Sequence, residues 1–201
     1  MIDIPVRSTA PERVVSSAVA DTYNFASARE HWLQLPACGV SVPTRELLTT
    51  PERFLQAMVD TTLDQRAAVP NWDLLWPQGG NLPHGERLLV MDFGCGLGVE
   101  SMPWARAGHE VLLADINPDS LAVAVRAYAI GALERRVAGL RAVIGEWPYF
   151  APSPRPLNVF LASGVLHHTP RAAEIMQRAG EEAAPDAIAA LLLYTDKAFE
   201  Y

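Results

Sequence analysis

The residues with the clearest chemical potential form a glycine-rich turn after a short apolar run. Residues 88–93 are apolar except for Asp92, and Gly94, Gly96 and Gly98 follow at every second position. Such a run is typical of a strand that is buried on both faces of a parallel sheet. The glycines let the backbone turn sharply and approach a ligand closely, and a following helix would point its free N–H groups at that ligand. The segment therefore predicts a binding site for a nucleotide cofactor.

The spacing of the glycines narrows the type of nucleotide. The dinucleotide fingerprint has the spacing Gly-x-Gly-x-x-Gly, whereas position 99 of this chain is valine. A P-loop is excluded because no Gly-Lys-Ser/Thr follows the turn. The spacing alone leaves one alternative open: the segment could be a plain glycine turn in an α/β protein that binds no nucleotide.

A second candidate residue is Asp115, which ends the apolar run 110–115. It lies about 20 residues after the glycine turn, where a nucleotide-binding sheet places the acid for a ribose. A carboxylate at this place can accept hydrogen bonds from both ribose hydroxyls. The alternative is that Asp115 only caps the helix that Asn117-Pro118-Asp119 would open.

A third segment carries a small-residue turn and two adjacent histidines. Residues 157–170 read Leu-Asn-Val-Phe-Leu-Ala-Ser-Gly-Val-Leu-His-His-Thr-Pro. Three motifs follow one another within residues 86–195. They are the acid-x-Gly-x-Gly-x-Gly spacing that begins at Asp92, the acid Asp115 and this third segment. Together they resemble the motifs of class I S-adenosylmethionine-dependent methyltransferases of the small-molecule type. The resemblance implies a Rossmann-like fold and S-adenosylmethionine as the cofactor.

The resemblance also implies which residues bind this cofactor. They lie after four of the expected strands and are Asp92, Gly94, Gly96, Gly98, Asp115, Ile116, Glu146, Trp147 and Ser163. The first four would line the methionine end, Asp115 would hold the ribose, and Ile116 would pack on the adenine. Glu146 and Trp147 match the usual adenine position, although residues 145–148 could also be a simple turn. Ser163 and Gly164 would lie near the transferable methyl group.

His167 and His168 are the candidate catalytic residues. An imidazole titrates near neutral pH, so one of them could act as a general base for a hydroxyl or amine acceptor. Adjacent side chains are expected to point apart, so at most one would face the site. The plainer alternative is that the pair shapes this loop through local hydrogen bonds. No metal site is expected, because no further His, Cys or acid lies at ligand spacing.

From about residue 86 onward, apolar runs alternate with helical patterns. This order predicts an α/β fold with a doubly wound, mostly parallel sheet. The strands are expected at 88–93, 110–115, 141–144, 157–162 and 188–194, and helices at 99–107, from Asn117 onward and at 172–184. The resemblance implies a C-terminal hairpin beside strand five; no segment for it follows in this sequence, so we expect a domain shortened after strand five. An apolar edge strand is rarely left open, so we expect a second copy or a partner chain to cover it.

Residues 1–83 are expected to form a helical N-terminal lid, and residues 84–201 the cofactor-binding domain. One helix is expected from Ser8 or Thr9 towards Leu35. A second would start with Thr50 as its cap and Pro51 as its first residue. Its apolar face would consist of Phe54, Leu55, Met58, Val59 and Leu63.

The N-terminal region is rich in aromatic residues, namely Tyr23, His31, Trp32, Trp72 and Trp76. By the resemblance, such rings could wall an apolar pocket and attract the sulfonium through cation–π contacts. The alternative is that they form the core of a small helical module.

Composition excludes several classes of protein. The formal net charge of −7 provides no basic surface for a phosphate backbone, so a nucleic-acid partner is not expected. No run is long enough to span a membrane, and the first residues do not form a signal peptide. The 2 cysteines cannot build a disulfide framework or a Cys-rich zinc site, and a cytoplasmic protein is expected.

The sequence as a whole predicts an S-adenosylmethionine-dependent methyltransferase that acts on an O, N or C atom of a small molecule. Two alternatives remain. One is a cofactor-binding subunit without activity, and the other is an enzyme of this fold with a different reaction, such as a cyclisation.

Overall fold

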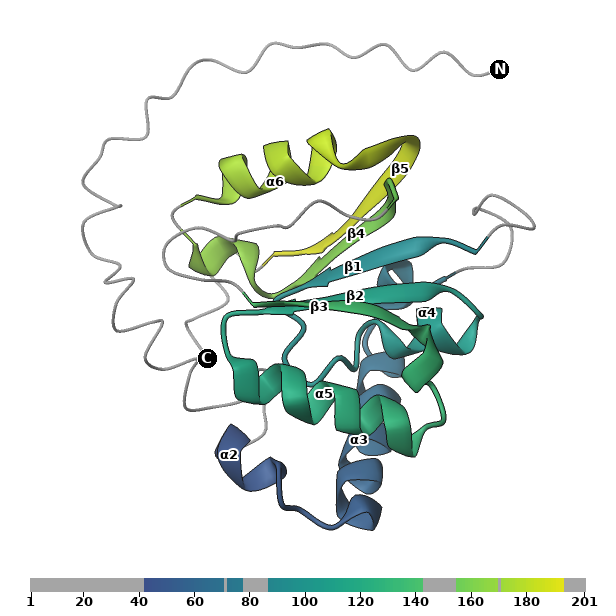
Figure 1. The fold of residues 1–201 in the computed structure, drawn as a ribbon, viewed down its shortest axis with the longest axis vertical. Helices are drawn as coiled ribbons and strands as arrows, with labels where there is room; N and C mark the ends of the chain where they lie inside the picture. The colour runs from purple at the N-terminus through teal and green to yellow at the C-terminus, as the bar shows by residue number, and fades with distance from the viewer. Residues whose placement is uncertain (1–41, 71, 78–86, 143–154, 170, 194–201) are drawn as a thin grey trace.

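The fold is built on a five-stranded parallel sheet, seen in a computed structural model that describes residues 42–70, 72–77, 87–142, 155–169 and 171–193. The order of the strands across the sheet is β3-β2-β1-β4-β5, and all four neighbouring pairs are parallel (Figure 1). The strands are β1 (Leu89–Phe93), β2 (Glu110–Asp115), β3 (Val137–Ala142), β4 (Leu157–Ser163) and β5 (Ala183–Leu192). The predicted α/β, doubly wound sheet is confirmed.

The order of the strands reverses between β1 and β4. From β1 the chain runs outward through β2 to β3, then returns to the other side of β1 and runs outward again through β4 to β5. In open α/β sheets, ligands bind outside the carboxyl ends of the strands at such a reversal. Both the glycine turn and the Ser163–His168 segment leave the sheet at this place.

Helices cover both faces of the sheet (Figure 1). One face carries α6 (Ala172–Glu181), and the other carries α3 (Glu52–Ala67), α4 (Met102–Arg106) and α5 (Pro118–Ile130). Alternate residues of β1 supply the two faces, because Leu89 and Met91 belong to the α6 cluster whereas Val90 belongs to a cluster on the opposite face. Strand β1 is buried at every position, as predicted for a central parallel strand.

Several predicted boundaries are wrong. Strand β3 begins at Val137 rather than at 141, because Val137 already pairs with Val111 of β2. Strand β5 begins at Ala183 rather than at 188, since Ala183 pairs with Leu157 directly after α6. Helix α6 accordingly ends at Glu181 rather than at 184. Helix α4 spans only 102–106 of the predicted 99–107, because residues 98–101 still belong to the turn.

The second predicted N-terminal helix is present as α3, with two corrections. Pro51 rather than Thr50 is its N-cap residue, and the Thr50 hydroxyl instead donates to the Glu46 carbonyl at 3.0 Å. Phe54 is 54% exposed, whereas the sequence pattern placed it on the buried face. Leu55, Val59 and Leu63 are buried as predicted. The helix predicted from Ser8 or Thr9 towards Leu35 lies outside the described residues.

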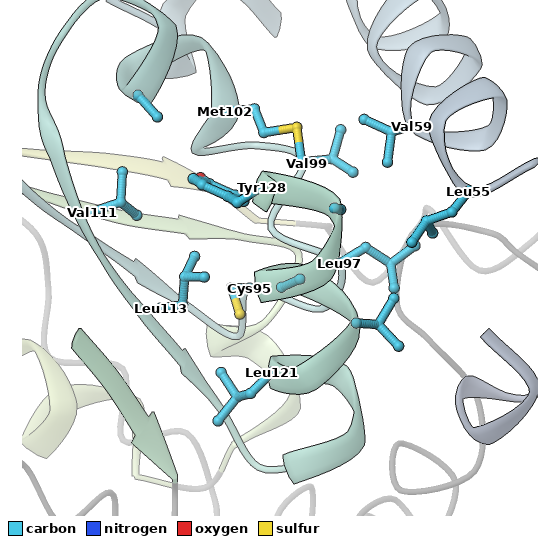
Figure 2. Packing of buried hydrophobic residues seen from close by; sticks show 14 of the residues in the cluster. Leu55, Val59, Cys95, Leu97, Val99, Met102, Val111, Leu113, Leu121 and Tyr128 are labelled. Atoms are coloured by element: carbon cyan, nitrogen blue, oxygen red, sulfur yellow. The ribbon is translucent and has the colours of Figure 1, made fainter. Parts of the chain in front are cut away.

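Helix α3 and the glycine turn share one hydrophobic cluster. Leu97 and Val99 of the turn point towards Leu55 and Val59 of α3 (Figure 2). Arg126 of α5 donates to the carbonyls of Leu47, which ends α2 (Thr44–Leu47), and of Leu48 and Thr50, which lie before α3. The separate lid at 1–83 stays a prediction, but residues 44–67 pack as part of the same core as the sheet.

Candidate functional site

The glycine turn after β1 is fastened to the end of β2 by three backbone N–H groups. Those of Gly94 and Cys95 both donate to the Ala114 carbonyl, at 2.8 and 2.9 Å. The N–H of Gly96 donates to the Asp115 carboxylate at 2.8 Å. The turn is thus held in shape at the carboxyl end of the central strands.

Two of the glycines are required by their neighbours as well as by their backbone. Gly94 and Gly98 have φ angles of 70° and 71°, in the left-handed region that disfavours a Cβ. A Cβ on Gly94 would lie 2.5 Å from the side chain of Val165, which follows β4. A Cβ on Gly98 would lie 3.0 Å from the ring of Tyr128 and 3.3 Å from Ala124. Gly94 therefore allows the β1 and β4 turns to meet, and Gly98 allows α5 to pack on the turn.

Asp115 links the turn to the end of β2. Its Oδ2 accepts the N–H of Gly96 and its Oδ1 accepts the N–H of Asn117, both at 2.8 Å. Burial raises the pKa of this carboxyl, while the N–H groups of Asn117 and Gly96 lower it. A carboxylate offers about four acceptor positions, so these two bonds leave capacity for ligand hydroxyls. Ile116 is half-buried beside it.

Asp92 lies inside the protein, with only 1% of the residue exposed. The Ser101 hydroxyl donates to its Oδ2, and the Tyr128 hydroxyl donates to Ser101 Oγ at 3.0 Å. Burial raises the pKa of Asp92 to about 7, against the lowering effect of Ser101. Within the described residues this carboxyl holds the turn on α4 and α5, and its contact with a cofactor stays a prediction.

The segment after β4 brings the remaining site residues to the same edge. Ser163 ends β4 and is half-buried, and the N–H of Gly164 donates to the Leu192 carbonyl of β5 at 2.9 Å. Leu166, which begins the short helix η3 (Leu166–His168), is buried in the α6 cluster. This anchor fixes where the two histidines lie.

The expectation that the histidine side chains point apart is wrong. The ring centroids of His167 and His168 are 4.0 Å apart, with 49° between their planes. Both residues lie in the short helix η3, and their rings lean towards each other there. Burial lowers the pKa of His167, which favours its neutral imidazole over the charged form.

Some predicted residues lie elsewhere. Glu146 and Trp147 are outside the described residues. Trp72 is buried and Trp76 half-buried beside α4, and both pack in hydrophobic clusters. No group of three or more His, Cys, Asp or Glu in the described ranges could hold a metal ion. The helices seen there are too short or too polar to cross a membrane.

Sequence reasoning missed Glu100, which follows the turn directly. It is 7% exposed and binds Arg66 of α3 and Trp72 of η1 (Trp72–Leu75). The available signal was one charged residue in an otherwise apolar stretch from Leu97 to Trp104 that also contains Ser101. Its partners lie about 30 positions away, so the pairing could not be foreseen.

No protein family and no curated protein matches the chain, but many solved structures do. The [4+2]-cyclase SpnF is 16% identical, with 66% of this chain and 44% of that chain covered and a TM-score of 0.51. A SAM-dependent methyltransferase from Geobacter sulfurreducens in complex with S-adenosyl-L-homocysteine is 20% identical, with 67% and 47% covered and a TM-score of 0.43.

The ribosomal protein L11 methylase from Lactobacillus delbrueckii is 15% identical, with 68% and 58% covered and a TM-score of 0.43. The chain thus spans about half the length of these solved chains. At such identities the likeness is one of fold. The described part of the chain has a Rossmann-like α/β fold, which it shares with the cyclase.

Proposed function

We propose that this protein is an S-adenosylmethionine-dependent methyltransferase that acts on a small molecule. The observation that carries the proposal is the bond between Asp115 and the N–H of Gly96, at 2.8 Å. This bond joins a carboxylate that could bind a ribose to a glycine turn that could line the methionine end of the cofactor. Both lie where the order of the strands reverses. The order of the three sequence motifs supports the same cofactor.

The residues present fit this cofactor. Asp115 has acceptor capacity left for ribose hydroxyls, and Ile116 beside it can contact an adenine. The turn at 94–98 would line the methionine end, and Ser163 would lie near the methyl group. Glu146 and Trp147 are proposed for the adenine by the sequence resemblance alone.

The chain's own contribution is mainly positioning. When bound, S-adenosylmethionine supplies a methyl group that is activated by its sulfonium. The protein has to orient the acceptor and exclude water. His167 or His168 would act as the base if the acceptor must lose a proton, and the burial that lowers the pKa of His167 favours the neutral form a base requires.

The first test is binding of S-adenosylhomocysteine by calorimetry. We expect Asp115→Ala to weaken binding by roughly ten- to a hundredfold, because two charge-assisted hydrogen bonds are lost. Circular dichroism of the variant checks that it remains folded. If folded wild-type protein gives no heat with either S-adenosylmethionine or S-adenosylhomocysteine, the proposal is wrong. An unchanged dissociation constant would remove Asp115 from the ribose role alone.

A second assay separates the proposal from its two alternatives. Radiolabelled methyl transfer into candidate small-molecule acceptors would occur only with an active methyltransferase. Cofactor binding without transfer would point to a subunit without activity, or to a different reaction on this fold. A cyclisation is the alternative reaction that we retain, because a solved cyclase shares the fold.

The partners that we propose follow from the surface and the sheet. The acidic net charge of −7 favours a small-molecule acceptor over a nucleic acid, and we propose a cytoplasmic location. We also propose that a second copy or a partner chain covers β5. Ile188, Leu191 and Leu193 support this, since they are 45%, 37% and 53% exposed.

A further inference from the structure

Glu100 occupies a special place between the glycine turn and α4. It lies two residues beyond Gly98 and directly before Ser101, the N-cap residue of α4. Its Oε1 accepts the Nε–H of Arg66 at 3.0 Å, and its Oε2 accepts the indole N–H of Trp72 at 2.7 Å. Both carboxylate oxygens are therefore bound by residues that precede the sheet in the chain.

The two partners of Glu100 also bind each other. The guanidinium of Arg66 lies over the ring of Trp72, 4.2 Å from its centroid. Trp76 is a third neighbour that lowers the pKa of the carboxyl, although its indole N–H has no hydrogen bond to any described residue. The three bound residues form a unit, which we call the Glu100 clasp: Arg66, Trp72 and Glu100.

A buried carboxylate at position 100 would destabilise the folded state if Arg66 and Trp72 did not bind it. Burial raises the pKa of Glu100, and Trp72 and Arg66 act against this effect. Removal of one partner would leave the buried Glu100 carboxylate with less compensation for its charge, which destabilises the fold, whereas apolar residues could fill the same space. Charged groups that are kept at such a cost can serve to fix one arrangement of the neighbouring elements.

Other contacts reinforce the same connection. Leu97 and Val99 of the turn pack against Leu55 and Val59 of α3 (Figure 2). The indole N–H of Trp104 in α4 donates to the Leu75 carbonyl of η1 at 2.9 Å. The segment from α3 to η1 therefore lies against the outer side of the turn, opposite to its bonds with β2.

We propose that Glu100 is a positioning residue of the donor site: through Arg66 and Trp72 it holds α3 and η1 against the glycine turn and so sets the shape of that turn. The proposal rests on the proposed function, because the turn is taken as the site of S-adenosylmethionine. Helix α3 and the short helix η1 then act as a fixed wall of this site and not as a detached lid.

The test compares Glu100→Gln with the wild-type chain. Gln keeps the size and one acceptor oxygen, but it removes the charge and places an NH2 group against the N–H donor of either Arg66 or Trp72. We expect S-adenosylhomocysteine to bind about tenfold more weakly at a temperature where circular dichroism shows the variant fully folded. A residue that only stabilised the fold would lower the unfolding midpoint without changing affinity under those conditions.

Arg106→Gln is the matched control. Arg106 of α4 pairs with Asp60 of α3 at 3.7 Å, and both side chains are about half exposed, at 50% and 52%. This variant breaks an ion pair between the same two helices on the surface, so we expect its affinity to equal that of the wild type.

Trp72→Phe provides a milder variant if Glu100→Gln does not fold. It removes the N–H bond to Oε2 and keeps an aromatic ring beneath Arg66, and we expect a smaller but measurable loss of affinity. Equal affinity for the wild type and for a folded clasp variant overturns this inference alone. Absence of binding by the folded wild type overturns both this inference and the proposed function.

Discussion

Gly98 combines an unusual backbone angle with a crowded environment. Two independent factors disfavour a side chain at this position. The φ angle is 71°, and the ring of Tyr128 lies 3.0 Å from where a Cβ would be. The ring belongs to a fully buried side chain and cannot swing aside as a flexible side chain could. The third glycine of the turn is therefore needed for helix packing, and a ligand is not required to explain it.

We expect Gly98→Ala to lower the free energy of unfolding by about 1–3 kcal/mol, because it adds backbone strain and a steric overlap. Urea unfolding followed by circular dichroism measures this change. Gly180→Ala is the control, since Gly180 lies in α6 with nothing within 4 Å of its added Cβ. That variant should be neutral or more stable by up to about 1 kcal/mol. Equal stability of Gly98→Ala and the wild type would contradict the packing argument.

At the scale of single residues, sequence alone predicted the positions of the glycine turn and of Asp115, because their spacing follows from strand, turn and strand. It did not predict that the Ser101 hydroxyl binds the Asp92 carboxyl or that Tyr128 of α5 in turn binds Ser101, since these residues lie 9 and 27 positions apart in the chain. It also placed the His167 and His168 rings apart, because the spacing of two adjacent residues does not reveal how their side chains turn. Contacts between distant segments are the part that a pattern cannot supply.

Strand β5 is more exposed than strands β1, β2 and β4. Among the described strands only β4 pairs with it. Residues on both of its faces are exposed: Ile188 shares the face of Val159, and Leu191 lies on the opposite face. A parallel strand of this composition is normally buried on both sides, so β5 fits an interface between chains.

We expect light scattering to show a particle of about twice the 21.9 kDa chain mass at micromolar concentration. Leu191→Lys should shift it towards the monomer, because a charge would enter the apolar contact. Phe54→Lys, which changes a 54% exposed residue on α3, should leave the mass unchanged. A stable wild-type monomer would remove the second copy from the proposal.

The predicted elements differ in accuracy for a physical reason. β2 was predicted with the right bounds and β1 and β4 within one residue, since central parallel strands are continuous apolar runs. The starts of β3 and β5 were missed. Residues 183–187 read Ala-Ala-Pro-Asp-Ala, which favours no strand, and pairing with β4 decides their conformation.

For the whole molecule, the buried carboxyl of Asp92 couples stability to pH. The folded state keeps its proton up to a pKa of about 7, whereas the unfolded chain loses it near the ordinary value of 3.8. As pH rises through this window, only the folded state binds the proton, so the free energy of unfolding falls. His109 acts in the opposite sense below its ordinary value of 6.5, because burial lowers its pKa.

Asp92→Asn should remove the pH dependence of the free energy of unfolding that Asp92 contributes. Relative to the wild type, we expect the variant to gain stability between pH 4 and pH 8, by up to about 4 kcal/mol. Urea unfolding at several pH values gives this difference. Asp60→Asn makes the same change at a carboxylate whose side chain is 52% exposed, and its difference from the wild type should stay small. A pH-independent difference for Asp92→Asn would contradict the burial argument.

The packing of Leu97 and Val99 on α3 bears on how proteins of this fold could exchange parts. These two side chains of the turn pack against Leu55 and Val59 of α3 and not against the sheet alone. Recombination could replace the N-terminal helices with those of a distant homologue. The glycine turn would then pack against side chains other than Leu55 and Val59. Such a chimaera would need compensating changes at positions 97 and 99, and the two segments are therefore expected to evolve as one inherited unit.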